Sequence, residues 1–371
     1  MDPKRPGLVD RLASSNAAMS ILVVLLGFLV GTVLLLAVAR DPANMYRAVI
    51  QVVSGWDLAR GTWNSRYIGE WLVASVPLIL CGLSMAFAAR AGLFNIGAEG
   101  QYIVGLTVAQ FSAFCLPRVP IFHWAAAIAL GMLAAAAWGG IVGFLKAKYS
   151  VSEVVATIMM NYVALYGSRY ATQFIPGTNT YKTPNFPATA RLSNAWLEGL
   201  TNNSRLNTGV FLTLAAVLFF WFIMEKTRTG FALRATGFNK DAARCSGINV
   251  QRSLTLSMAI SGAFAGLAGC IVALGSFGYG RVLAGLDNYG FTGIAVALVG
   301  NSAAFGTFLA GLLFGMLQSA QPLMQSRQIP KEVTYIISGL VVVFISLRPG
   351  LGLILDARAK AAARRGSLRD E

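Results

Sequence analysis

Long apolar runs joined by shorter polar connections make up most of this 371-residue chain. A helix of about 20 apolar residues is long enough to cross a bilayer. The pattern therefore predicts an all-α, polytopic membrane protein with about ten transmembrane helices, organised as one domain over residues 1–371. The predicted spans are 19–39, 70–89, 103–116, 122–145, 154–170, 210–224, 254–275, 291–299, 303–319 and 333–347.

A glycine-rich stretch, 92–100, interrupts the pattern between the second and third spans. Its glycines argue against a continuous helix, and irregular backbone at membrane depth is tolerated only against protein or a water-filled cavity. Glu99 is the one carboxylate between residues 72 and 145, and an acid such as Asp costs roughly 2.5–3.5 kcal/mol at the centre of a span. Asn95, Glu99 and Gln101 are thus predicted to border a translocation path.

A second interpretation gives Glu99 a structural role, and the two can hold together. The carboxylate would accept hydrogen bonds from glycine amides and hold the broken helix in place. Gly300 and Asn301 mark a second predicted break, because transporters often carry paired broken helices in two related halves. Asn301 is accordingly a further candidate for the path.

The polar, basic segment 225–252 lies between two long apolar runs. Asn239 before residues 240–246 is a good N-cap and Gly247 after them is a good C-terminal stop, so a helix of about two turns is expected. A helix this short needs packing to be stable. Because it lacks the large apolar face of a headgroup-bound helix and is rich in small residues, docking on a protein is favoured over docking on lipid.

Two motifs carry a family resemblance. The run 232–249, with the pattern ALRAxGxxxxAAxxxGIN, is followed by ISGAxAGLAG at 260–269. Together they resemble the coupling segment of bacterial ABC-importer permeases of the branch that handles ribose, branched-chain amino acids and related solutes. The run 94–101, FNIGxEGQ, is similar to a motif in permeases for nucleosides and simple sugars.

The resemblance implies that the short helix enters a cleft on a separate ATPase subunit and transmits its closure. The residues assigned to this coupling are Arg234, Ala235, Gly237, Asn239, Lys240, Asp241, Ala242, Arg244 and Gly247. It also implies a second permease subunit, identical or related, and an extracytoplasmic solute-binding protein. By resemblance, nucleosides are the first choice of solute, simple sugars the second and amino acids the third.

Charge supports a membrane location rather than nucleic-acid binding. Only 12% of residues are charged and 56% are hydrophobic, against roughly 25% charged in soluble domains. The net charge of +15 falls in loops and tails, where positive-inside orientation and anionic lipid explain it. This bias favours a cytoplasmic N-terminal segment (1–18), coupling loop (225–252) and basic tail (348–371), although Arg40, Arg47, Arg60 and Arg66 weaken it. The resemblance implies that the membrane is the bacterial inner membrane.

Catalytic and cofactor motifs are missing from the sequence. No GxxxxGK[ST] motif occurs, so ATP hydrolysis is expected on another polypeptide. The four cysteines form no Cys-x-x-Cys pair, and the single histidine, His123, stands next to Trp124 at the start of a span, where an interfacial position is expected. We therefore expect no catalytic residue, no metal site and no cofactor on this chain.

Three alternatives remain open at this level. A secondary transporter driven by a proton or sodium gradient would use Glu99 as its coupling acid. A membrane enzyme would need a catalytic constellation that this sequence does not offer. A non-transporting membrane scaffold would be isolated without an ATPase or a binding protein.

Overall fold

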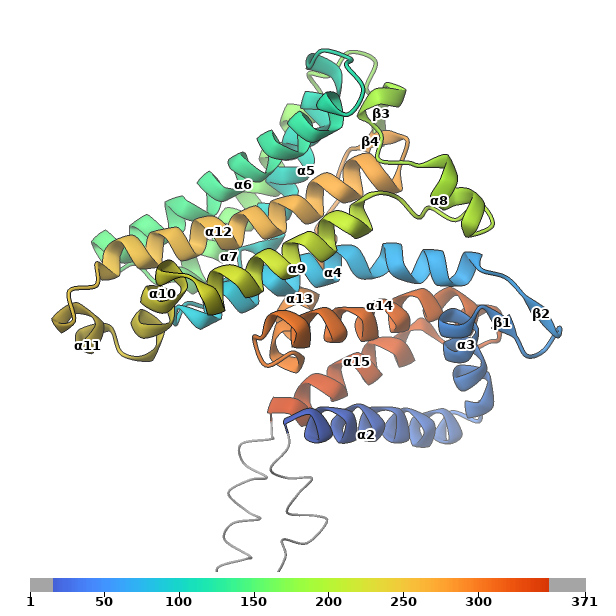
Figure 1. The fold of residues 1–371 in the computed structure, drawn as a ribbon. Coiled ribbons are helices and arrows are strands. Elements are labelled where there is room, and N and C mark those ends of the chain that lie inside the picture. Colours follow the sequence, from blue (N-terminus) through green and yellow to red (C-terminus); the bar gives the residue numbers. More distant parts are fainter. Residues whose placement is uncertain (1–15, 347–371) are drawn as a thin grey trace, which may run out of the picture. The chain divides into compact units, whose positions relative to one another are not determined.

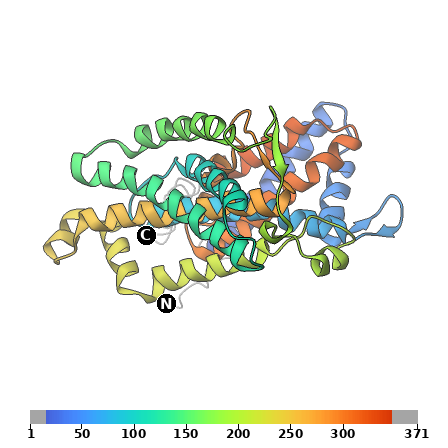
Figure 2. The same ribbon diagram turned by 90° about the horizontal axis from the view of Figure 1, so that it is seen from above.

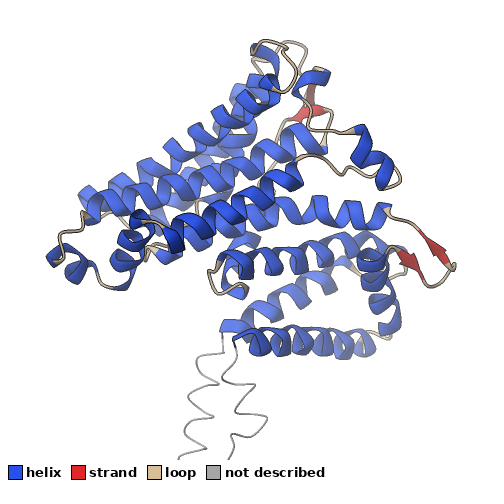
Figure 3. Cartoon of the chain, in the orientation of Figure 1, coloured by secondary structure: helices blue, strands red, loops and turns tan. Residues whose placement is uncertain are grey.

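The computed structural model describes residues 16–346 and is almost entirely helical there (Figures 1 and 3). The predicted tail 348–371 lies outside the described residues, as do the first fifteen residues of the predicted N-terminal segment. The chain divides into two compact units, residues 1–46 with 321–371 (unit 1) and residues 47–320 (unit 2).

Unit 1 is built on the antiparallel return of the last helix beside the first. Its elements are α2 (Asn16–Ala37), the start of α3 (Pro42–Ser54), the end of α14 (Ala304–Ser326) and α15 (Lys331–Ser346). A Cβ on Gly31 would lie 2.7 Å from the side chain of Ile337, so α2 and α15 are in close contact. Met45, Val49, Val52 and Val53 recur at helical spacing, which is consistent with the helix α3.

Unit 2 holds the remaining helices, and most begin or end within a few residues of the predicted spans. They are α4 (Arg66–Arg90), α5 (Ala98–Cys115), α6 (Phe122–Tyr149), α7 (Glu153–Thr172), α9 (Gly209–Lys226), α12 (Val250–Ile271) and α13 (Tyr289–Val299). Among the described residues, four helices are both long and apolar enough to cross a membrane: α4, α6, α9 and the continuous stretch Val250–Ser276. The count of ten spans stays a prediction.

Small residues bring the central helices of unit 2 into backbone contact. A Cβ on Gly105 of α5 would lie 2.5 Å from the Cα of Gly266 on α12, and one on Gly143 of α6 would lie 2.8 Å from the Cβ of Met258. The spacing Gly139-x-x-x-Gly143 is typical of closely packed membrane helices, and both glycines of α6 face the backbone of α12. Without a hydrophobic driving force in lipid, such close approach maximises van der Waals contact between helices.

Helix α5 begins earlier than the sequence suggested. The predicted span started at residue 103, but α5 starts at Ala98, so Glu99 and Gln101 lie in its first turn. The segment 225–252 is also not a plain loop, because it contains α10 (Arg228–Phe238) as well as the short helix α11 (Lys240–Cys245).

His123 is held inside the fold at the start of α6, and its position at the membrane interface stays a prediction. Its side chain is fully buried, and its Nδ1 is 2.8 Å from the hydroxyl of Thr189 in the long connection after α7. That connection folds over the start of α6, and no local sequence pattern predicts this contact.

The two ends of unit 2 differ in character. One end, here called the basic end, carries α10 and α11; the other, here called the loop end, carries α8 (Ala195–Leu200) and the pair β3 (Lys182–Asn185) and β4 (Tyr279–Arg281) (Figure 1). These strands pair antiparallel, with Lys182 opposite Arg281 and Asn185 opposite Tyr279. A second small hairpin joins β1 (Trp56–Asp57) to β2 (Thr62–Trp63).

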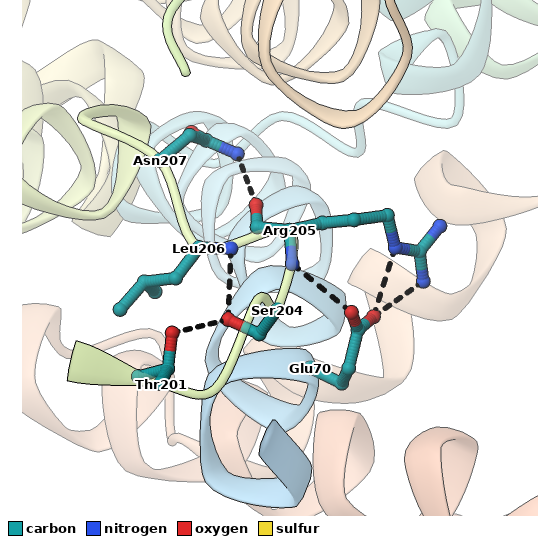
Figure 4. A network of polar contacts seen from close by, with 6 residues as sticks. All are labelled: Glu70, Thr201, Ser204, Arg205, Leu206 and Asn207. Atoms are coloured by element: carbon teal, nitrogen blue, oxygen red, sulfur yellow. Dashed lines mark hydrogen bonds and ion pairs between the residues drawn. The ribbon is translucent and has the colours of Figure 1, made fainter. Parts of the chain in front are cut away.

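At the loop end, an ion pair ties α4 to the connection before α9. Both guanidinium nitrogens Nε and Nη2 of Arg205 donate to one carboxylate oxygen of Glu70, at 2.9 and 2.6 Å, and the Arg205 backbone N–H donates to the other at 3.0 Å (Figure 4). Ser204 completes the turn by accepting the backbone N–H of Leu206 (Figure 4). The outer end of α4 is thereby fixed to the loop end.

Candidate functional site

The chain folds back on itself between α4 and α5. After Arg90 it turns at Gly92, whose φ of +73° suits glycine, and residues 91–97 (here the return loop) run back along α4 until Asn95 meets Ser84. Ser84 stands six residues before Arg90, which is about 9 Å along a helix. Helix α5 therefore starts well inside the length of α4, at the depth where the sequence predicted a break.

A buried polar cluster forms where the return loop meets α12. The amide nitrogen of Asn95 donates to Gln101 Oε1 at 2.8 Å and to Ser261 Oγ at 2.6 Å. The Ser261 hydroxyl donates in turn to the backbone carbonyl of Ser84, at 2.7 Å. All four side chains are buried, so their mutual bonding replaces the water that they lose.

Glu99 joins the N-terminus of α5 to the N-terminus of α13. One carboxylate oxygen accepts the backbone N–H of Asn288 at 2.7 Å, and the other accepts that of Gly290 at 2.6 Å. A Cβ on Gly290 would lie 2.6 Å from the Cα of Glu99, so the two helix ends are in backbone contact. A carboxylate is well placed here because helix N-termini carry unpaired N–H groups and partial positive charge.

Beyond this junction, toward the loop end, lies a charged clamp. Arg281 donates two hydrogen bonds to Asp287, both at 2.8 Å, and the Tyr102 hydroxyl donates to Asp287 at 2.9 Å. Burial lowers the pKa of the Arg281 guanidinium, but its bonds to Asp287 and the charge of Asp287 outweigh burial, so that the pKa lies above its ordinary value. The clamp holds the chain that leads into α13.

Helix α7 is fastened to the return loop from the other side. The Asn161 side chain accepts the backbone N–H of Gly100 at 2.8 Å and donates to the carbonyl of Ile96 at 3.1 Å. A Cβ on Gly97 would lie 2.9 Å from the methyl group of Thr157. Asn161 therefore links α7 by hydrogen bonds to the return loop and to the first turn of α5.

The structure brings three of the four predicted path residues together and leaves the fourth apart. Asn95, Glu99 and Gln101 lie within one buried region, whereas Asn301 is exposed in the turn between α13 and α14, with φ +53°. Glu99 sits at the start of the 11-residue α13 and Asn301 beyond its end, about 16 Å along the helix. The role of all four residues in a translocation path stays a prediction.

At the basic end, the predicted two-turn helix is present with its predicted caps. The Asn239 side chain accepts the backbone N–H groups of Asp241 and Ala242, both at 3.0 Å, and α11 follows directly. Gly247, with φ +79°, ends the turn. The capping prediction is therefore confirmed.

Most of the residues predicted to meet an ATPase are on the surface of this segment. Those with exposed side chains are Asn239, Lys240, Asp241, Ala242 and Arg244. Ala235 is partly buried, and the Arg234 guanidinium forms an ion pair with Glu225, which also binds Arg90. Arg234 thus holds α10 to the ends of α9 and α4.

The segment 225–252 contacts the return loop directly. A Cβ on Gly237 would lie 2.8 Å from both the carbonyl carbon of Ala91 and the amide nitrogen of Gly92. Ala243 of α11 is buried in the same apolar cluster as Leu93 and Ala88. Two contacts therefore connect this surface segment to the loop that carries Asn95 and leads into Glu99.

Sequence reasoning missed three features of this region. Phe238, the last residue of α10, is 95% exposed, and a signal was available, since a phenylalanine inside a basic polar segment has no local reason to be there. The second missed feature is Glu225, whose carboxylate forms ion pairs with both Arg90 and Arg234. The partners of Asn95 on α4 and α12 had no sequence signal, because Ser84 and Ser261 are 177 residues apart.

Comparison with known proteins decides the family. Residues 67–346 match the family described as "Branched-chain amino acid transport system / permease component". The chain belongs to this permease family. It is a multi-pass membrane protein and a permease subunit of an ABC importer, a transport component rather than an enzyme, and the resemblance found in the sequence is confirmed.

The permease has similar relatives along nearly its whole length. It is 38% identical to the guanosine ABC transporter permease protein NupP of Bacillus subtilis, over 85% of this chain and 93% of the relative. It is 34% identical to the nucleoside ABC transporter permease protein NupB of Lactococcus lactis, over 92% and 93%. A glucose ABC transporter permease protein, TsgB13 of Haloferax volcanii, is 33% identical over 92% and 91%.

Proposed function

We propose that this permease carries a nucleoside or a simple sugar into the bacterial cell through the inner membrane, driven by ATP hydrolysis on a separate subunit. The basic end and both chain termini face the cytoplasm, where an ABC ATPase docks on α10 and α11. The loop end faces outward and receives solute from an extracytoplasmic binding protein. A second permease subunit, identical or related, completes the path, and membrane lipid covers the remaining apolar faces.

The contact between Gly237 and the return loop carries this proposal. It places the surface that meets the ATPase against the backbone of Ala91 and Gly92, a few residues before Asn95. A displacement of α10 and α11 has to move the return loop, because two glycine backbones in direct contact have no flexible side chain to absorb it. The return loop then changes the buried polar cluster and the junction of α5 with α13.

The solute class follows from the relatives and fits the polar cluster. Relatives of similar length bear the names of guanosine, nucleoside and glucose transporters. Nucleosides and sugars are neutral and rich in hydroxyl groups, and amide and hydroxyl side chains such as Asn95, Gln101 and Ser261 can exchange hydrogen bonds with them. A nucleoside is the first choice and a simple sugar the second.

This chain needs no cofactor and forms no covalent intermediate in the proposed cycle. Its residues open and close a route, and ATP binds to the partner subunit. Phe238 and the exposed face of α11 supply the docking surface, because a protruding aromatic side chain is well suited to anchor a protein contact. We expect weak solute binding in the path, since release on the far side requires it.

Vesicle transport tests the proposal. The complete transporter is placed in sealed vesicles with its binding protein, and uptake of labelled guanosine and of labelled glucose is measured with and without internal ATP. We expect uptake of at least one probe that requires ATP and continues when an ionophore removes the proton and sodium gradients. Uptake that follows a gradient and ignores ATP would overturn the proposal in favour of a secondary transporter using Glu99.

A further inference from the structure

Helix α7 presents a row of tyrosines that the other described residues, within 16–346, leave exposed. Tyr162, Tyr166 and Tyr170 are spaced four residues apart, so they lie on one face of the helix. Their exposed fractions are 48%, 61% and 68%. Within the described part of the chain, none of the three phenol hydroxyls has a hydrogen-bond partner. Figure 2 shows α7, in green, along one edge of unit 2, with no other helix over its outer side.

The phenol hydroxyls distinguish this face from the exposed middle of α9. Between its two ends, α9 exposes apolar side chains that include Leu214, Leu218 and Phe222, and α9 is apolar enough to cross a membrane. Helix α7 has 20 residues but is not among the described helices that meet this criterion. A phenol hydroxyl in hydrocarbon would stay unpaired at a cost of several kcal/mol, and tyrosine in membrane proteins concentrates at the interfaces instead.

The row begins at the depth of the return loop and its buried polar cluster, together called the polar break here. Asn161, next to Tyr162, is bonded to the backbone of Ile96 and Gly100. Asn161 contacts Gly100, and seven residues further along both helices the hydroxyl of Ser168 lies 2.6 Å from that of Thr107. Helices α7 and α5 therefore run parallel. The tyrosines therefore continue from the break toward the loop end in steps of about 6 Å.

We propose that Tyr162, Tyr166 and Tyr170, here called the tyrosine ladder, line the aqueous route of the solute between the loop end and the polar break. The ladder serves a solute with a flat ring, a purine or pyrimidine base or the apolar face of a sugar, which stacks on one phenol ring after another. Aromatic stacking tolerates many ring structures because each has a flat face. Three equivalent weak sites allow a solute to enter without being held.

The inference rests on the proposed function and specifies its route. It also gives the attachment of Asn161 a second role, since movement of the return loop would shift the ladder. The face has two other possible coverings, lipid and a neighbouring subunit. Both leave the tyrosines without access to water, which distinguishes them from the proposed aqueous route.

Cysteine labelling in the complete transporter provides the first test. Cysteine is introduced singly at positions 162, 166 and 170, and at 218 on α9 as a matched control, in a chain whose exposed Cys115 and Cys245 are replaced by serine. A membrane-impermeant thiol reagent reacts with the thiolate, which needs water. We expect labelling at 166 at least tenfold faster than at 218 and slower in the presence of guanosine. Labelling at 166 as slow as at 218 would overturn the inference, whether lipid or a subunit covers the face.

Uptake of guanosine by ring variants provides the second test. Tyr166→Phe keeps the ring and should stay within about threefold of the wild type, whereas Tyr166→Leu should lose at least tenfold, with uptake normalised to the amount of ATPase that copurifies. Leu218→Ala should be neutral. Normal uptake by Tyr166→Leu would refute the ladder alone, while a wild type that shows no ATP-driven uptake of guanosine or glucose would refute the proposed function instead.

Discussion

At the scale of single residues, the decisive observation concerns Glu99. Both of its oxygens accept backbone N–H groups at the start of α13, so the carboxylate is already committed to holding two helix ends together. The sequence left a structural and a functional role open for this residue, and the geometry supports the structural one. The buried acid satisfies amides at the start of α13 that would otherwise be unpaired.

Replacing Glu99 by glutamine separates the two roles. Glutamine keeps the shape but has one acceptor oxygen instead of two, and its NH₂ group faces an N–H donor. Since hydrogen bonds to charged groups contribute about 1.5–3 kcal/mol, we expect Glu99→Gln to lower the melting temperature of the purified complex. Uptake per assembled transporter should persist. An unchanged melting temperature with abolished uptake would assign the carboxylate to the path.

The sequence predicted part of this site and not the rest, for physical reasons. Asn95, Glu99 and Gln101 could be grouped because they lie within one glycine-rich stretch of an otherwise apolar chain. The clamp of Tyr102, Arg281 and Asp287 could not, because its members are up to 185 residues apart and pair only after folding. Asn301 was assigned by analogy between the two breaks; it lies in an exposed turn apart from the other three residues, and its role stays a prediction.

At the scale of elements, the sequence predicted a helix best where capping residues mark both of its ends. Asn239 and Gly247 define α11 by short-range chemistry, so the sequence predicted it. The start of α5 was predicted five residues late, because its glycines favour a loop in isolation. In the fold, Asn161 and the backbone of α13 hold this first turn, and tertiary contact outweighs propensity.

Removing the cap of α11 should weaken the docking of the ATPase. Asn239→Ala loses two hydrogen bonds to the first turn, a change that costs about 1 kcal/mol in typical helices, which corresponds to about fivefold in affinity. Asn239→Asp keeps an acceptor and serves as the matched control. Copurification of the ATPase at several concentrations measures the effect, and equal binding by the two variants would show that the cap is irrelevant to docking.

The backbone contact at Gly237 should be essential for coupling. Gly237→Ala places a methyl group within 2.8 Å of Ala91 and Gly92, which forces α10 away from the return loop. We expect uptake to fall at least tenfold while ATP hydrolysis stays within about twofold. Gly140→Ala is the control, because its Cβ would meet only Ala259, at an ordinary 3.5 Å. Full uptake by Gly237→Ala would remove this contact from the mechanism.

At the scale of the whole molecule, the proposal makes the basic end the surface on which the ATPase acts. Phe238 is almost fully exposed there, next to a helix whose outward side chains are polar. Because exposed aromatic anchors dominate protein contacts, Phe238→Ala should weaken ATPase binding at least tenfold and leave the melting temperature of the permease unchanged. Leu218→Ala, which removes an exposed side chain elsewhere, should do neither. Unaltered binding by the Phe238 variant would place the docking surface elsewhere.

Two native cysteines test the central claim, that the basic end is the cytoplasmic docking surface, most directly. Cys245 lies on α11 at the basic end, and Cys115 ends α5 at the loop end; both are exposed. With an impermeant maleimide, we predict that Cys115 is labelled in intact spheroplasts and Cys245 only in inside-out vesicles, where bound ATPase protects it. Labelling of Cys245 in intact spheroplasts would contradict the account.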